Sequence, residues 1–479
     1  MNQGTEREVL LTGATGFVGK VVLETLLRRR YELGLRRIRV LVRAGDERHA
    51  AARLRELLRS PCFDGLEPGW EQLVVPIAGD VTRSGFGLAS EAREQVARST
   101  SWLIHCAASV EFDLPLAEAY RVNTGGARHA LELARACPRL TSFVDVSTAY
   151  VTPHPRPGER RAARADETLA PLPVDAAKLA AEIESGRADE AALLARTGHP
   201  NTYTLTKSLA EHLLARGLDG LPLTIVRPSI VSASRAHPRP GWIDSAAAFG
   251  GFVVLIGTGR LRVVAGDPRA RLDVVPCDEV ANRIVEAALD PPARGTLRIR
   301  HAVAGLDGAL PIALCRERIV DWFSRHPVGG AARVHFVGRS GPLFRTAHAL
   351  GHELPGLGAA VWLALRRRAN EGRAVRKLLE RQRAINRDFA YFTHATFDFA
   401  ASRPLDPPLD PAAYLELVCE GVSRHLLRRE RRTRRGTAPA PLATTTAGRA
   451  PTGSVRSAPR PERESLCTKS SGRESSGSA

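Results

Sequence analysis

The chain contains few lysines, cysteines and aromatic residues, and such scarcities limit which classes of protein and site are possible. Aromatic residues make up 5% of the sequence, and seven cysteines are scattered without Cys-x-x-Cys spacing. This excludes a disulfide framework and gives no zinc-finger pattern, so we expect no metal and a reducing, cytoplasmic compartment. Only five of the 69 basic residues are lysines, namely Lys20, Lys178, Lys207, Lys377 and Lys469.

Long apolar runs are also missing. Residues 1–8 are polar, so we expect no signal peptide. The run at residues 246–256 is too short for a transmembrane helix, which needs about 20 residues. Such a run suits either ordinary core or the wall of an acyl pocket.

The net charge of +18 is concentrated in two segments, residues 366–383 and 428–479, which hold 14 of the 18 charges. The rest of the chain is nearly balanced. The distribution therefore does not predict a basic groove along the protein, and we expect no nucleic-acid partner.

The scarcity of lysine makes one motif stand out. Tyr203 and Lys207 are four residues apart in a stretch that reads as helix, residues 200–211, so both side chains would lie on one helix face. About 0.06 such pairs are expected by chance at this lysine frequency. A lysine cation beside a phenol lowers the phenol pKa, and the pair can donate a proton to a developing alkoxide. The alternative is a half-buried tyrosine beside a solvated lysine.

The N-terminal stretch predicts a nucleotide site. A strand at residues 9–12 leads into a glycine turn, and apolar residues then recur at helical spacing. Gly13 permits the tight turn, Gly16 lets the backbone approach a pyrophosphate, and Gly19 lets the helix pack on the strand. The alternative is a plain tight turn. The candidate cofactor contacts here are Gly13, Thr15, Gly16, Phe17, Val18 and Gly19.

Arg43 follows a second expected strand at residues 38–42. An acidic residue at this place would accept a hydrogen bond from a ribose 2′-hydroxyl, whereas a guanidinium suits a 2′-phosphate. The sequence therefore favours NADPH over NADH, unless Arg43 is simply a solvated arginine.

Strands expected at residues 73–77 and 103–108 carry three more candidate cofactor contacts. Asp80 either accepts from an adenine amino group or caps a turn, and Val81 follows it. Ala107 is small, which lets a ribose lie close. We expect the neighbouring His105 to be structural rather than catalytic.

Polar residues complete the candidate catalytic set. A strand at residues 142–146 ends in Ser147 and Thr148, where open parallel sheets place ligands and where a hydroxyl can bond an oxygen that gains charge. The alternative for both is an ordinary turn residue. Asn123, in a helix expected over residues 116–136, would hold a backbone carbonyl or a water near Lys207. The strand at residues 223–226 continues into the last two candidate cofactor contacts, Pro228 and Ile230.

The remaining segments predict the domain organisation. An NADPH-binding domain is expected over residues 1–310, with an insert at 152–199 that holds an alanine-rich helix, residues 174–196. The insert is either a lid or surface decoration. A mostly helical domain follows at residues 311–430, and a tail rich in Arg, Ser and Pro, residues 431–479, is expected to be disordered.

One expected helix of the second domain has two interpretations. Residues 357–365 are apolar, and three arginines follow directly. This suits peripheral contact with an anionic membrane surface, or a buried helix with an arginine end.

Taken together, these motifs resemble those of an extended short-chain dehydrogenase/reductase. Five runs narrow the resemblance to the fatty acyl-CoA reductases of the male-sterility family: residues 12–20, 147–151, 200–211, 227–231 and 240–244. It covers residues 6–305 well and continues more loosely to about residue 430. Ser232 and Cys277 depart from residues usual in the family, and we expect no C-terminal membrane span of the kind frequent in animal members.

The resemblance implies an α/β fold, a Rossmann-type doubly wound parallel sheet with a mostly helical C-terminal domain. It also implies NADPH and reduction of a long-chain acyl-CoA, or an acyl carrier protein thioester, to an alcohol by way of an aldehyde. Tyr203 would be the general acid, Lys207 would lower its pKa and hold the nicotinamide ribose, Thr148 or Ser147 would position the carbonyl, and Asn123 would complete the proton relay.

Three other functions stay open from the sequence. A related thioester reductase would stop at the aldehyde. The same core also serves sterol dehydrogenases and sugar-nucleotide epimerases. A redox sensor would bind NADPH without chemistry, although the intact Tyr203 and Lys207 pair speaks against it.

Overall fold

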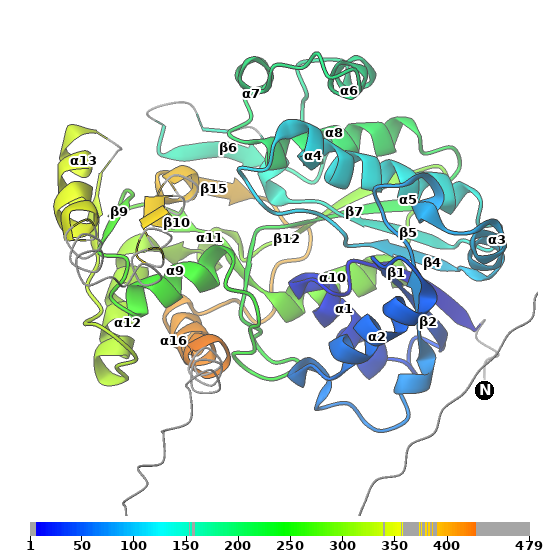
Figure 1. Cartoon of the computed structure of the whole chain (residues 1–479), viewed down its shortest axis with the longest axis horizontal. Coiled ribbons are helices and arrows are strands. Elements are labelled where there is room, and N and C mark those ends of the chain that lie inside the picture. Colours follow the sequence, from blue (N-terminus) through cyan, green and yellow to red (C-terminus); the bar gives the residue numbers. More distant parts are fainter. Residues whose placement is uncertain are drawn as a thin grey trace, which may run out of the picture. The chain divides into compact units, whose positions relative to one another are not determined.

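A seven-stranded parallel sheet organises the N-terminal part of the chain (Figure 1). The strand order is β12-β7-β5-β4-β1-β2-β3, and every neighbouring pair is parallel. The strands are β1 (Arg7–Thr12), β2 (Leu35–Val42), β3 (Val74–Ala78), β4 (Trp102–His105), β5 (Ser142–Val146), β7 (Leu223–Pro228) and β12 (Leu297–Ala302). The first six in chain order correspond to the strands expected above, although β4 ends at His105, three residues earlier than predicted.

The computed structural model describes residues 6–427 except 153, 156–158, 339–340, 356, 358–372, 374, 376–378, 381, 384–385 and 387–389. Three sequence-based expectations therefore lie outside the described residues: the helix at 359–368, nearly all of the membrane-surface segment 357–365, and the tail 431–479. No helix in the described ranges is both long and apolar enough to cross a membrane.

Helices cover both faces of the sheet. Because side chains alternate along a strand, Val144 and Val146 of β5 pack with α1 (Phe17–Arg28) and α10 (Cys277–Leu289) in one core. Phe143 packs with α5 (Gly126–Arg135) and α8 (Thr202–Arg216) in another. Two helix layers on one parallel sheet make the fold doubly wound, as predicted.

Two expected helices are not continuous. Residues 116–136 form α4 (Leu116–Ala119), a π-helical turn (Tyr120–Gly125) and α5. Residues 174–196 form α6 (Ala176–Glu184) and α7 (Glu190–Thr197), so the prediction of one helix was wrong. Gly186 between them has a φ of +69°, and the Asp189 carboxylate caps α7 by accepting from the Ala192 amide at 2.8 Å.

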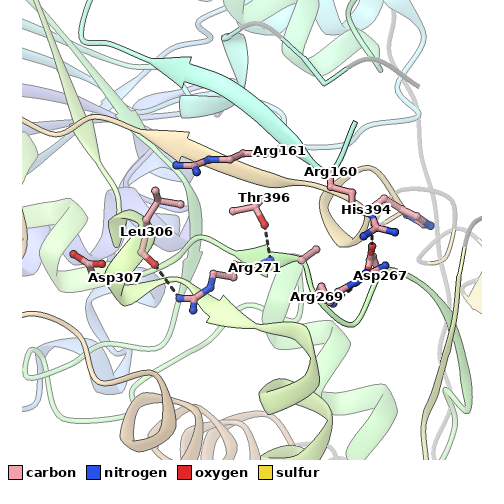
Figure 2. A pocket seen from close by; sticks show the side chains of 10 residues that line it. Arg160, Arg161, Asp267, Arg269, Arg271, Leu306, Asp307, His394 and Thr396 are labelled. Atoms are coloured by element: carbon pink, nitrogen blue, oxygen red, sulfur yellow. Dashed lines mark hydrogen bonds and ion pairs between the residues drawn. The ribbon is translucent and has the colours of Figure 1, made fainter. Parts of the chain in front are cut away.

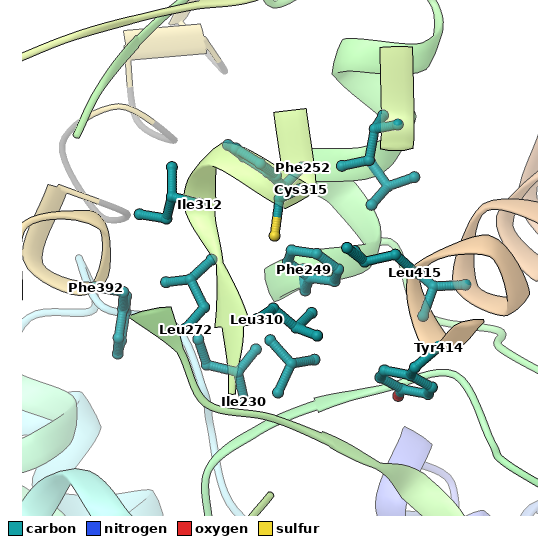
Figure 3. Packing of buried hydrophobic residues seen from close by; sticks show 14 of the residues in the cluster. Ile230, Phe249, Phe252, Leu272, Leu310, Ile312, Cys315, Phe392, Tyr414 and Leu415 are labelled. Carbon is teal, nitrogen blue, oxygen red and sulfur yellow. The ribbon is translucent and has the colours of Figure 1, made fainter. Parts of the chain in front are cut away.

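A second core lies beyond the sheet's carboxyl edge. It gathers α9 (Ala248–Gly257), α12 (Ile312–Arg325) and α16 (Pro411–Gly421). Figure 3 shows Phe249 of α9 and Cys315 of α12 among its buried side chains. The apolar run at residues 246–256 is thus largely core helix. Residues on both sides of position 310 share this core, and the domain boundary stays a prediction.

Short strands join this second part to the first. β6 (Arg161–Ala165) lies in the insert and pairs in parallel with β15 (Thr396–Phe399). β8 (Ile230–Ser232) pairs with β11 (Val274–Pro276), and β10 (Arg271–Leu272) pairs with β13 (Leu310–Pro311). The last pair is β9 (Val263–Ala265) with β14 (His335–Val337). The described C-terminal part therefore contains strands that periodicity did not predict, beside α12, α13 (Pro342–His348) and α16.

Candidate functional site

The candidate pair Tyr203 and Lys207 lies on α8, which begins at Thr202 within the stretch 200–211 that the sequence predicts as helix. The Asn201 carboxamide caps it by accepting from the Thr204 amide at 2.9 Å. Tyr203 and Lys207 then lie one turn apart on the same helix. Lys207 is buried, and its Nζ donates to the backbone carbonyl of Val146, the last residue of β5, at 2.8 Å. The expected pair is therefore anchored to the carboxyl end of a central strand.

Tyr203 is half-buried beside a hydroxyl. Its ring packs at 5.5 Å from the Phe112 ring, and the Thr148 hydroxyl lies close enough to its phenol to influence the phenol pKa. Burial raises the pKa of Tyr203 to about 12, and the Thr148 hydroxyl only partly opposes this. The expected lowering of the pKa by Lys207 is not found, since burial dominates and Thr148 is the group that opposes it. At neutral pH the phenol holds its proton and can donate it.

Thr148 and Ser147 have different surroundings. The Thr148 hydroxyl accepts a hydrogen bond from the Tyr150 amide at 3.3 Å. It donates one at 3.4 Å to the carbonyl oxygen of Pro228, the last residue of β7. The Ser147 hydroxyl is buried, and among the described residues it has no hydrogen-bond partner. Of the two, Thr148 is the hydroxyl beside the phenol.

Asn123 holds α8 in place through Thr206. Among the described residues, its side-chain hydrogen bonds do not involve Lys207. It lies in the π-helical turn, where its Oδ1 accepts from the Ser109 amide at 2.9 Å and its Nδ2 donates to the Thr206 hydroxyl at 3.1 Å. The carboxamide thus ties the segment after β4 to α8. Its role in a proton relay stays a prediction.

The glycine turn forms a close backbone cradle. Gly13 has a φ of +76°, and a Cβ there would lie 2.6 Å from the Ala107 amide nitrogen. A Cβ at Gly19 would lie 2.2 Å from the Gly13 carbonyl oxygen. Gly16 is the N-cap of α1, so the first free amides of that helix point into the cradle. These residues fit a dinucleotide pyrophosphate.

The other residues of the glycine motif surround this cradle. Thr15 is exposed, Val18 packs against the sheet core, and the Phe17 ring stacks on Trp242 at 5.7 Å. Lys20 forms an ion pair with Asp244. The loop at residues 240–244 is thereby attached to the first turn of α1.

Arg43 and Asp80 lie at the ends of the adjacent strands β2 and β3. Arg43 is exposed, which leaves its guanidinium accessible to a phosphate. Asp80 caps its own turn, since it accepts from the Thr82 amide at 2.9 Å and the Thr82 hydroxyl at 2.8 Å. Partial burial acts to raise the pKa of Asp80, but these bonds and the Arg43 charge outweigh it and lower the pKa. Val81, which follows, and Ala107 are partly buried.

Sequence reasoning missed Asp145 on β5. This buried carboxylate has no hydrogen bond to either oxygen among the described residues. Burial raises its pKa to about 6, while the Lys207 charge lowers it and the Glu211 charge raises it. Burial also disfavours the charged form of Lys207 and so lowers its pKa. The Asp145 carboxylate is the strongest charge that opposes this lowering. The only sequence signal was an acid within an apolar strand.

Glu211 and Arg227 form a second buried pair near Lys207. Arg227 Nε and one terminal nitrogen donate to the two Glu211 oxygens at 2.9 and 2.5 Å, and both side chains are 1% exposed. The arginine also donates to the Thr168 carbonyl at 3.0 Å. Glu211 is four residues after Lys207, so helical spacing would have placed it on the same face.

His105 is structural, as expected. It is buried beside the Phe86 ring, and its Nδ1 lies 2.9 Å from the Thr12 hydroxyl. That hydroxyl also accepts from the Ala107 amide at 3.2 Å. Burial and the Lys207 charge lower the pKa of His105 to about 3, so the ring stays neutral.

An aromatic wall leads away from Tyr203. Phe112 contacts Phe392 at 5.7 Å between ring centroids, and Phe392 contacts Tyr150 at 4.7 Å. Tyr150 in turn packs edge-on against Phe397 of β15 at 5.1 Å. The C-terminal part of the chain therefore supplies apolar surface next to the phenol. Ile230 lies in the same buried core.

The residues that the structure describes contain no group of three or more metal-ligating side chains. The sequence does contain a His-x-x-x-His pair, His348 and His352, so the expectation that no such zinc-like spacing occurs was wrong. The His352 Nε2 nevertheless accepts from the Arg262 and Val263 amides at 3.2 and 3.0 Å.

Comparison with known proteins gives relatives by sequence and by fold. The family model described as "Male sterility protein" matches residues 11–284. Fatty acyl-CoA reductase 1 of Pongo abelii is 33% identical over 337 residues, which cover 68% of this chain and 63% of that relative. Fatty acyl-CoA reductase wat of Drosophila melanogaster is 33% identical over 288 residues, which cover 60% and 54%. The matches thus span less than two thirds of these relatives' length.

Two solved structures share the fold. The terminal R domain from the myxalamid PKS-NRPS biosynthetic pathway is 23% identical with a TM-score of 0.60, and the match covers 89% of this chain and 92% of that one. The reductase (R) domain of a nonribosomal peptide synthetase from Mycobacterium tuberculosis is 20% identical with a TM-score of 0.57, covering 88% and 92%.

Proposed function

Because the chain belongs to the male sterility protein family and is related to fatty acyl-CoA reductases, we propose that it reduces a long-chain acyl-CoA with NADPH to the fatty alcohol by way of the aldehyde. The observation that carries the proposal is that the Tyr203 phenol on α8 lies beside the Thr148 hydroxyl, which follows β5, with Lys207 one helical turn away.

The site suits a carbonyl that gains negative charge. A bound nicotinamide supplies the hydride. The Tyr203 phenol and the Thr148 hydroxyl then hydrogen-bond the thioester oxygen as it becomes an oxyanion. Collapse of that oxyanion breaks the carbon–sulfur bond and releases the CoA thiolate.

The aldehyde formed in this first step remains a substrate for the same groups. A second hydride from another NADPH reduces it, and Tyr203 now gives up its proton to the alkoxide. Lys207, buried one helical turn away, would hold the nicotinamide ribose. The aromatic wall of Phe112, Phe392 and Tyr150 excludes water on one side of the phenol.

NADPH is favoured by the end of β2. Arg43 is an exposed guanidinium at the position where a ribose 2′-phosphate would lie, and no acidic side chain occupies that position to accept from a 2′-hydroxyl. The Oδ1 of Asp80, at the end of the adjacent strand, is engaged with Thr82.

The test is a stoichiometry. Purified protein is incubated with palmitoyl-CoA and either NADPH or NADH, and oxidised cofactor is counted against CoA thiol released. The proposal predicts two NADPH per thiol and much slower reaction with NADH. One NADPH per thiol would make the protein an aldehyde-forming thioester reductase, and no turnover would reject reduction of acyl-CoA.

A further inference from the structure

A cavity of about 460 Å³ lies on the second part of the chain, apart from the glycine cradle (Figure 2). Four segments far apart in sequence line it: residues 160–161, 267–271, 306–307 and 394–396. We name it the arginine pocket, because Arg160, Arg161, Arg269 and Arg271 all line it. Its volume is in the range of small-ligand sites.

Charge in the arginine pocket is unbalanced. Asp267 serves two of the four guanidiniums, Arg160 at 3.3 Å and Arg269 at 3.2 Å. Arg161 pairs at 2.7 Å with Asp398, which lies outside the lining. The only other acid in the lining is Asp307. Four guanidiniums against three carboxylates, Asp398 included, leave a net positive site.

Arg271 is the one of these four guanidiniums that forms no ion pair within the described residues. Within the described residues its side chain bonds only the Leu306 carbonyl, at 3.2 Å. Its backbone amide donates to the Thr396 hydroxyl at 3.0 Å, which fixes β10 against β15 and leaves the hydroxyl hydrogen to donate elsewhere. A guanidinium with several free N–H groups beside a hydroxyl matches phosphate oxygens.

The arginine pocket and the aromatic wall beside Tyr203 share the two-stranded sheet of β6 and β15. Phe397 and Phe399 of β15 face the aromatic wall that starts at Tyr203, whereas the alternate residue Thr396 lines the pocket. His394 also lines it, two residues after Phe392 of that wall. A long flexible substrate would therefore place its reacting end and its anionic end on the two sides of β6 and β15.

We propose that the arginine pocket binds the phosphates of the coenzyme A nucleotide while the thioester lies at Tyr203. This rests on the proposed function and selects free acyl-CoA over a carrier-protein thioester. A carrier presents a single phosphodiester, whereas the 3′-phosphorylated ADP of coenzyme A presents phosphate groups that need several cations.

The kinetic test separates the nucleotide from the acyl chain. Arg271→Glu and the milder Arg271→Gln are compared with Arg98→Glu, which makes the same charge change on the exposed surface of α3 (Ser90–Ser99). Substrates are palmitoyl-CoA and S-palmitoyl pantetheine, which has the same thioester without any phosphate. Charge-assisted bonds of this kind predict a rise of about tenfold or more in KM for palmitoyl-CoA in Arg271→Glu. KM for the pantetheine thioester and for NADPH should stay unchanged, as should all constants of Arg98→Glu.

Direct binding makes the result independent of turnover. Adenosine 3′,5′-bisphosphate is titrated calorimetrically into protein saturated with NADP⁺, so that the dinucleotide site is filled. Binding that is lost in Arg271→Glu supports the arginine pocket even if palmitoyl-CoA is not reduced, in which case only the proposed function fails. Equal binding by both proteins, no binding by the natural protein, or an equal rise in KM for both thioesters would overturn the inference.

Discussion

Lys207 donates a 2.8 Å hydrogen bond to the carbonyl of Val146, and the residue before Val146 is the buried acid Asp145, whose carboxylate has no hydrogen-bond partner in the described part of the chain. The ammonium that the sequence placed beside Tyr203 is thus held by the strand beneath it. Burial lowers the pKa of Lys207. Two nearby acids, Asp145 and Glu211, oppose that lowering by favouring the charged ammonium. Glu211 already forms an ion pair with Arg227. Asp145 is therefore the acid of the two whose charge is not balanced by that arginine.

Asp145→Asn should change stability in a pH-dependent way. The pKa of Asp145 is raised from 3.8 to about 6, so its charged form destabilises the fold. The stabilising contribution is present below pH about 4 and is lost as pH rises through about 6. A shift of this size corresponds to roughly 3 kcal/mol. The free energy of unfolding of Asp145→Asn should therefore gain on that of the natural protein between pH 4 and pH 7.5. A pH-independent difference, measured by urea denaturation, would contradict the assignment.

Glu211→Gln should destabilise the fold strongly. It leaves the buried Arg227 guanidinium without its carboxylate, which costs about 3–5 kcal/mol for a buried pair. The matched control is Glu94→Gln, whose partner Arg98 is exposed, and no measurable loss is expected there. Equal unfolding free energies for the two variants would show that the buried pair does not stabilise the protein.

Gly13→Ala should cost both stability and cofactor affinity. The positive φ alone costs about 1–2 kcal/mol for a residue with a Cβ. The new methyl group would also meet the Ala107 backbone and displace the turn from its position near the pyrophosphate. Gly186→Ala is the control, because it has a similar φ with nothing within 4 Å. NADPH affinity, measured by fluorescence titration, should fall only in Gly13→Ala. Unchanged affinity there would remove the cradle from the cofactor site.

Arg43→Ala should alter cofactor choice. Loss of a charge-assisted bond to a 2′-phosphate predicts a rise of about tenfold or more in KM for NADPH. KM for NADH should stay the same, as should both values in Arg48→Ala, another exposed arginine nearby. If both cofactors weaken equally in Arg43→Ala, then Arg43 does not read the 2′-phosphate.

The features that the sequence predicted correctly depend on residues that lie close together along the chain. Tyr203 and Lys207 are one helical turn apart, and the glycine turn joins a strand to the next helix, so local rules placed both. The parallel strands were also predicted, because buried strands are short apolar runs.

Long-range packing decided the rest. β6 pairs with β15 across more than two hundred residues, and no local pattern indicates such a partner. The π-helical turn that aims Asn123 at Thr206 looks like ordinary helix in sequence. Whether Lys207 or burial dominates the pKa of Tyr203 depends on how deep α8 packs, which spacing alone does not give.

The most direct test of the account is the turnover number for palmitoyl-CoA reduction by Tyr203→Phe. The control is Tyr414→Phe, since Tyr414 is also buried and its hydroxyl donates to the Ala233 carbonyl at 2.7 Å. Loss of the proton donor predicts a decrease of about 10²- to 10⁴-fold in kcat for Tyr203→Phe, with NADPH affinity retained and with Tyr414→Phe close to the natural protein. A Tyr203→Phe protein that keeps most of its turnover would contradict the central claim.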